Sequence, residues 1–291
     1  QLANTIYTSE LSAGVALAGF TPTVLTVTTN ADTTTGSNMT SVAALLANRG
    51  ADGQISLREA ITAANNTAGV TTIRFNFSGT ITLGSALPTI IKPIIIDGST
   101  VPGYLNLPPA PNNFDLNTYL STYTTQQQRA ANFESYLTAG SGINTNSQRI
   151  NITSSAAANF DFFVLGNGSA GAVIKGLELS SYGSNAISIT TTDTAGVTIQ
   201  DNYIHGQNTS TGAEYAIQIS GTGGNHIIKN NILGGGDIIL NVSNTTTANN
   251  QISFNTLLSE TTGGAANGAL TYFGDNGYLY YNKVKIGRAH V

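Results

Sequence analysis

The sequence predicts an all-β fold over residues 72–285: a right-handed parallel β-helix, in which short strands stack into a solenoid. Three observations lead to this prediction. A strand pattern recurs at similar intervals through the C-terminal half, with no helix between its copies. Only 9% of the residues are charged, against about 25% in a typical soluble domain. Much of the remaining polar content is Gly, Ser, Thr and Asn, which favour turns and strand surfaces over helices.

The repeat consists of an apolar residue, two variable residues, Asn, one variable residue and a second apolar residue. The copies begin at Ile174, Ile199, Ile228, Ile252 and Leu279, so they are 25, 29, 24 and 27 residues apart. The first copy has Leu177 in place of the asparagine. Rungs of a β-helix stack about 4.8 Å apart, a spacing over which amide side chains hydrogen-bond to one another. We therefore expect a structural ladder at one corner, formed by Asn202, Asn231, Asn255 and Asn282.

Further strands are expected between and before these copies. Alternating apolar residues predict a second strand in successive rungs, at residues 186–189, 216–219, 238–242 and 269–273. Earlier strands are expected at residues 72–77, 80–83 and 90–97. The pattern breaks over residues 101–148, where several prolines precede a Gln-rich stretch with helical spacing of apolar residues. This segment is predicted to be an irregular or helical insertion on the outside of the solenoid.

Residues 24–71 are expected to form an N-terminal cap, whereas residues 1–23 give no clear prediction of order. Ser56 and Glu59 have the spacing of a capping box, which starts a helix. Ile55 and Ala60 are placed for a hydrophobic staple at the same helix start. A solenoid exposes the core of its first rung unless another element covers it. The helix that begins at Ser56 is suitably placed to do so.

Composition and charge exclude several classes of function. The formal net charge is −4, and the 11 basic residues form no run, so no nucleic-acid partner is expected. The chain has no cysteine, which removes disulfides, thiol catalysis and cysteine-ligated zinc. No window approaches the run of about 20 apolar residues that spans a bilayer. A transmembrane segment is therefore not expected.

Both ends of the sequence are interpreted as those of a fragment. The chain opens on Gln1 rather than Met, so any export signal is expected upstream. At the other end, residues 286–291 match the translation of a common sequencing-adapter sequence. We interpret these residues as a non-native tail, and His290 therefore carries no weight in the functional argument.

Several of these motifs resemble those of a known family. Residues 27–32, 55–65, 72–75 and 79–83 are similar to the CSLREA domain, which begins many secreted bacterial right-handed β-helix proteins, including polymorphic outer-membrane-protein-like and adhesin-like ones. Residues 94–104 and 173–177 are similar to the segments that follow it. Ile55 stands where the family motif has Cys, which removes any disulfide at that position. The resemblance implies a β-helix fold and display at the cell surface or outside the cell.

One outward column of the predicted solenoid carries candidate binding residues. The repeat alignment places Lys175, Gln200 and Lys229 in this column, with Glu178 and Asp201 nearby. Such a stripe suits an acidic sugar, and Tyr203 adds an aromatic face for a sugar ring or a protein surface. A solvated sheet face with ordinary charge pairs accounts for the same residues. This second interpretation is preferred, because a fold does not by itself imply a function.

No catalytic residue and no metal site are assigned from the sequence. His205 and His226 occupy different positions of the repeat and have no third ligand. Residues 234–237 are similar to part of a calcium-binding repeat but occur once, so a tight turn accounts for them better. The paired carboxylates that glycoside hydrolases need are not visible on any one column.

We therefore expect a non-enzymatic extracellular or cell-surface protein, a monomeric stalk or adhesin passenger that presents variable loops. We expect the contact regions to be the loops at residues 205–214 and 259–267, whose lengths vary most. A glycan or a protein on a host or neighbouring cell is the expected partner, and no cofactor is expected. The alternative is a polysaccharide lyase or other carbohydrate-active enzyme on an acidic glycan. Such an enzyme would use carboxylates to hold Ca²⁺ and a Lys or Arg as base.

Overall fold

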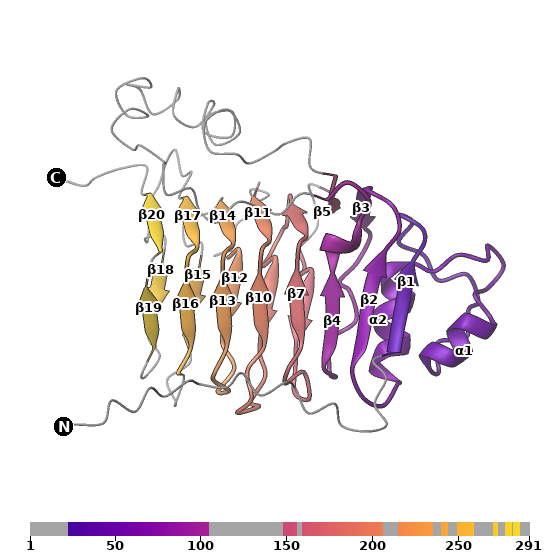
Figure 1. The fold of residues 1–291 in the computed structure, drawn as a ribbon, viewed down its shortest axis with the longest axis horizontal. Helices are drawn as coiled ribbons and strands as arrows, with labels where there is room; N and C mark the ends of the chain where they lie inside the picture. The colour runs from indigo at the N-terminus through magenta and orange to yellow at the C-terminus, as the bar shows by residue number, and fades with distance from the viewer. Residues whose placement is uncertain are drawn as a thin grey trace, which may run out of the picture.

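The predicted parallel β-helix is confirmed (Figure 1). The computed structural model describes residues 23–104, 148–155, 159–205, 215–234, 240–243, 249–258, 270–272, 277–280 and 282–285. In these residues, short strands pair in parallel into three sheets of eight, seven and five strands. From β4 (Ile94–Asp97) onward, successive strands enter the three sheets in turn, so the solenoid lengthens by one rung at a time (Figure 1).

Sheet 1 faces the viewer in Figure 1 and begins in the N-terminal cap. Its strands, in spatial order, are β1 (Thr23–Val27), β2 (Thr71–Phe75), β4 (Ile94–Asp97), β7 (Val173–Lys175), β10 (Thr198–Gln200), β13 (Ile227–Lys229), β16 (Gln251–Ser253) and β19 (Tyr278–Tyr280). Because β1 pairs along its whole length with β2, the sheet begins one strand before the boundary predicted at residue 72.

Sheets 2 and 3 complete each rung. Sheet 2 contains β3 (Gly79–Leu83), β5 (Ile150–Ser154), β8 (Glu178–Ser180), β11 (Tyr203–His205), β14 (Ile232–Gly234), β17 (Thr256–Leu258) and β20 (Lys283–Lys285). Sheet 3 contains β6 (Phe163–Leu165), β9 (Ile187–Ile189), β12 (Ile217–Ile219), β15 (Leu240–Val242) and β18 (Leu270–Tyr272).

The leading apolar residues of the repeat form one interior column of sheet 1. Ile174, Ile199, Ile228, Ile252 and Leu279 pair in exact succession, although the steps between them differ in length. The differences in length therefore fall in the connections between strands. The first four of these side chains are fully buried, and they belong to one continuous hydrophobic core that also includes the cap.

The strand expected over residues 90–97 is two separate pieces. Ile90 forms an isolated bridge with Leu165 in sheet 3, and only Ile94–Asp97 pairs in sheet 1, as β4. Pro93 lies between the two pieces and has no amide hydrogen to donate to a sheet ladder. The prediction of one continuous strand was wrong because this apolar run turns the corner between two sheets.

A left-handed residue makes the corner between sheets 1 and 2 in each repeat copy that the structure describes up to β17. Its φ is 70° at Gly176, 59° at Asp201, 55° at Asn230 and 56° at Phe254. Gly, Asn and Asp adopt this conformation most readily, whereas a bulky residue such as Phe254 adopts it rarely. The repeat asparagine, or Leu177 in the first copy, follows directly after this residue.

The predicted asparagine ladder is present at this corner. The side-chain amide of Asn202 donates to Oδ1 of Asn231 over 3.1 Å, Asn231 donates to Asn255 over 3.0 Å, and Asn255 donates to Asn282 over 3.0 Å. Each amide also donates backwards to a sheet 1 carbonyl, as Asn202 does to that of Ile174. Asn202, Asn231 and Asn255 are buried, so the ladder satisfies polar groups that solvent does not reach.

The cap consists of β1 and two helices, α1 (Val42–Ala47) and α2 (Leu57–Asn65), at the indigo end of Figure 1. The predicted capping box is confirmed, since Ser56 and Glu59 each accept from the other's backbone amide. Ile55 and Ala60, the expected staple residues, are both buried. Helix α2 packs against β1, β2 and β4, and thereby covers the first rungs of the solenoid.

The expected insertion leaves and returns at one place beside the short 3₁₀ helix η1 (Gly98–Thr100). Residues 105–147 lie outside the described residues, but both ends are described. The Arg149 guanidinium carbon lies 5.7 Å from the centre of the Tyr104 ring, and Ser78 donates to the Gln148 side chain over 2.7 Å. Burial raises the pKa of Tyr104, although nearby Arg149 opposes the shift. Residues 1–22 and 286–291 also lie outside the described part.

Candidate functional site

The outer face of sheet 1 carries the candidate lysines in one column, as the repeat alignment predicts. Lys175 pairs with Gln200, and Gln200 pairs with Lys229. The column also extends toward the cap, because Lys175 pairs with Asp97 and Asp97 pairs with Arg74. The alignment of the repeats did not include Arg74 and Asp97. The rungs of β2 and β4 lack the repeat asparagine by which the later rungs were aligned.

The charges of this column are only partly paired. The Lys175 ammonium lies 2.9 Å from Asp97, whose carboxylate also accepts hydrogen bonds from the amide and hydroxyl of Ser99. Arg74 and Lys229 are exposed, and no carboxylate among the described residues lies within ion-pair distance of either. Asp97 therefore positions Lys175, whose side chain is still 29% exposed, and the two other cations of the column are not paired with any described carboxylate.

Asp201 lies at the corner beside this column and has a structural role there. Its carboxylate accepts one hydrogen bond from the Asn230 amide and one from Gln200 over 2.9 Å. Asp201 and Asn230 are both left-handed corner residues of neighbouring rungs. The hydrogen bond between them therefore continues up the corner, on the outside of the buried asparagine ladder.

Tyr203 and Glu178 lie on the outer face of sheet 2, apart from the lysine column. Tyr203 stacks on His205, with ring centres 4.1 Å apart and planes inclined by 18°. His205 Nε2 lies 2.9 Å from the Glu178 carboxylate of the preceding rung. The four candidate binding residues thus fall into separate places: Lys175 and Lys229 on sheet 1, Asp201 at the corner and Tyr203 on sheet 2.

A polar cluster on sheet 3 was not predicted from the sequence. One oxygen of Asp161 accepts from the Ser184 hydroxyl over 2.6 Å and from the Asn185 backbone and side chain. The other oxygen accepts from the Ser188 hydroxyl over 2.6 Å. All of these donors belong to the next rung, so the carboxylate joins two rungs. No sequence signal marks it, because Asp161 lies in a segment without repeat spacing.

The two histidines occupy different environments, as expected. His205 is on the outer face of sheet 2, whereas His226 is fully buried in the interior, directly before strand β13 of sheet 1. Burial lowers the pKa of His226 to about 4, so the ring is neutral near pH 7. Within the described part of the chain, no three His, Cys, Asp or Glu side chains gather as metal ligands would.

Each carboxylate that the structure describes accepts hydrogen bonds or an ion pair from within the chain. All of them except Asp52 contact a group more than twenty residues away in the sequence, as Asp193 does by accepting from the Gly168 amide over 2.7 Å. The eight residues are Asp32, Asp52, Glu59, Asp97, Asp161, Glu178, Asp193 and Asp201. These carboxylates are positioned by, and contribute to, the stacking of rungs and the folding of the cap.

The remaining candidate features lie partly outside the described residues. This applies to the variable loops expected at residues 205–214 and 259–267, of which the structure describes only His205, and to the turn at 234–237, of which it describes only Gly234. Among the described residues, no helix is both long and apolar enough to cross a bilayer. Comparison with known proteins adds no assignment: no family model matches the chain, and no curated protein is similar to it.

Proposed function

We propose that this protein is a non-enzymatic extracellular or cell-surface β-helix protein, a stalk or adhesin passenger that displays its sheet faces and loops to a partner. One observation carries the proposal: polar side chains form hydrogen bonds from one rung to the next. The asparagine ladder, Asp161 and Asp193 all connect neighbouring rungs. Side chains used in this way support a stiff rod, which is the property that a stalk or display scaffold needs.

The sequence motifs support the same proposal. The resemblance of residues 55–65 to the CSLREA motif implies export, and low charge with many Thr, Ser and Asn residues suits a surface exposed outside the cell. The partner that we propose is a glycan or a protein on another cell. Exposed Arg74 and Lys229 favour an acidic partner, because neither is neutralised by a described carboxylate.

A polysaccharide lyase is the second candidate, favoured by the cations on one outer sheet. Such an enzyme would need a carboxylate cluster for Ca²⁺ next to a Lys or Arg base. Asp97 and Asp201 are the carboxylates nearest to the column in the described residues, and both already accept hydrogen bonds from within the chain. A calcium ion would have to displace Lys175 from Asp97 or the two amides from Asp201.

A combined binding and turnover experiment tests the proposal. The purified chain is applied to a glycan array with Ca²⁺ and with a chelator, and is separately incubated with acidic polysaccharides. We expect binding that the chelator does not abolish, or no binding at all for a passive stalk, with the polysaccharides unchanged in both cases. Release of unsaturated sugars that depends on Ca²⁺ would contradict the proposal and support the lyase.

A further inference from the structure

We infer that the outer face of sheet 1 binds a linear acidic polysaccharide that lies along the solenoid axis, with Arg74, Lys175 and Lys229 as its anion contacts. This inference rests on the proposed non-enzymatic function, because the bound polymer has to remain intact. It adds the class of ligand, the direction in which the ligand lies and Arg74 as a third contact.

The spacing of the cations is the first argument. The register of the sheet separates Arg74 from Lys175 by two rungs, with Asp97 between them. It separates Lys175 from Lys229 by two rungs as well, with Gln200 between them. Cations therefore recur about every 10 Å along the face, given a strand spacing of about 4.8 Å.

This interval matches a polysaccharide with an acidic group on every second sugar. A hexose ring extends a linear chain by about the spacing of one rung, so alternate sugars would meet alternate rungs. Nucleic acid matches the interval poorly, because its phosphates repeat about every 3.4 Å along each strand. The face thus favours a sparsely charged polymer over a densely charged one.

The neighbouring outward column supplies the apolar part of such a site. Ile95, Val173, Thr198 and Ile227 are half-buried and run parallel to the cations, two residues earlier on each strand. Beyond Ile227 the column continues with the exposed Gln251 and then Tyr278, which is 58% exposed. The β-branched side chains of this column present methyl groups to a sugar ring, and the exposed Tyr278 offers an aromatic ring for stacking.

Binding of hyaluronan oligosaccharides, which carry an acid on alternate sugars, tests the inference directly. We expect saturable binding that weakens with added salt, because the contacts are ion pairs at a surface. Replacement of both unpaired cations, R74Q with K229Q, should weaken binding roughly tenfold. The matched control is R49Q with K92Q, which removes two exposed cations away from this column and should change binding less than about twofold.

A second variant separates spacing from net charge. Gln200→Lys with Lys229→Gln moves one cation by a single rung and leaves the total charge unchanged. It should weaken the hyaluronan complex but not that of a polyuronate with an acid on every sugar. Three results would each overturn the inference. They are an equal loss of hyaluronan affinity in R74Q/K229Q and in its control, no hyaluronan binding by the wild type, and binding of single-stranded DNA as tight as that of hyaluronan.

The length of the polymer after incubation distinguishes the two proposals. Bound and intact hyaluronan supports both the site and the non-enzymatic function. If the polymer is bound but shortened, and R74Q/K229Q binds it more weakly as expected, the site is supported and the proposed non-enzymatic function is refuted. Glycan-array binding that R74Q/K229Q does not change refutes the site alone.

Discussion

At the scale of single residues, His226 is unusual because a titratable side chain is fully buried in the interior. Its Nδ1 accepts the backbone amide of Val197, and its own amide donates to the Asn250 side chain of the next rung. Nε2 is buried and has no hydrogen-bond partner among the residues that the structure describes. A neutral ring fits this position, whereas a protonated ring would place an unpaired charge in the hydrophobic core.

We predict that His226 makes the protein less stable in mild acid. Its pKa falls from 6.5 to about 4 on folding, so the unfolded chain takes up a proton that the folded chain rejects. The contribution of the neutral ring to the free energy of unfolding is complete above pH 6.5. It is lost as the pH falls toward 4, and the total loss is roughly 3 kcal/mol. Denaturant unfolding of the wild type and H226V, measured between pH 7 and 4, should show a shallower decline in the variant. Identical slopes would disprove the buried neutral state.

The asparagine ladder allows a second prediction at this scale. N231L would remove four hydrogen bonds in a buried corner: those that Asn231 accepts from the backbone and side-chain amides of Asn202, and those that its side chain donates to Asn255 and to the Ile199 carbonyl. We expect a loss of roughly 4 kcal/mol in the free energy of unfolding, because several buried polar groups become unsatisfied together. The control is N65A. It removes two hydrogen bonds that are exposed to solvent, and it should lower the free energy of unfolding by about 1 kcal/mol.

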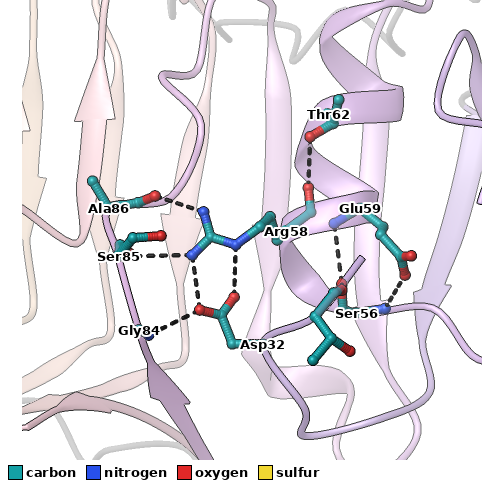
Figure 2. A network of polar contacts seen from close by, with 9 residues as sticks. Asp32, Ser56, Arg58, Glu59, Thr62, Gly84, Ser85 and Ala86 are labelled. Carbon is teal, nitrogen blue, oxygen red and sulfur yellow. Dashed lines mark hydrogen bonds and ion pairs between the residues drawn. The ribbon is translucent and has the colours of Figure 1, made fainter. Parts of the chain in front are cut away.

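At the scale of elements, Arg58 joins helix α2 to two distant segments (Figure 2). Its guanidinium makes two hydrogen bonds with the Asp32 carboxylate, at 2.9 and 2.8 Å, and donates to the carbonyls of Ser85 and Ala86. Asp32 in turn accepts the Gly84 amide over 3.0 Å. The cap is therefore fastened to the chain after β3 by one fork of hydrogen bonds.

We predict that R58M loosens the cap and lowers stability by about 3 kcal/mol, because it leaves the largely buried Asp32 carboxylate without its cation. The exposed Arg49 provides a control, since R49M should shift the unfolding midpoint little. Hydrogen exchange would localise the effect. Faster exchange in β1 and α2, with the later rungs unchanged, is the expected result, and uniform exchange throughout would argue against a local fastening role.

The same elements show how far sequence reasoning reaches. The capping box of α2 and the asparagine column were predictable, because each depends on a fixed spacing within one segment or one repeat. The partners of Arg58 were not, since Asp32 and Ala86 are 26 and 28 residues away. Arg74 was missed for a related reason: only the pairing through β4 brings it into the lysine column. Tyr203 was grouped with the lysines because a linear motif does not show that the corner lies between them.

At the scale of the whole molecule, burial of the core changes along the axis. Ile199 and Ile228 are fully buried in the middle of sheet 1, whereas Leu279 in the same interior column is 43% exposed. Nearest-neighbour rungs supply most of the stability of a solenoid. A residue with a described rung on both sides should therefore contribute more than one in the last described rung.

We predict that replacing a residue of this column with alanine costs less stability in the last described rung than in the middle of the sheet. I199A should lower the free energy of unfolding by about 3 kcal/mol, because it opens a cavity between two packed rungs. L279A should cost less than about 1 kcal/mol, since Leu279 is already 43% exposed to water. Chemical denaturation of both variants provides the comparison, and equal costs would show that the last described rung is as well enclosed as the middle ones.

The unequal lengths of the repeats have a practical consequence. The corner asparagines keep successive strands in register although the copies differ by up to five residues, the difference between the longest step of 29 and the shortest of 24. Foreign peptides grafted into the connections would thus occupy known heights on the rod, each set by the number of rungs below it. The protein is in this sense a molecular ruler, on which two grafted epitopes can be placed at a chosen separation in steps of about 4.8 Å.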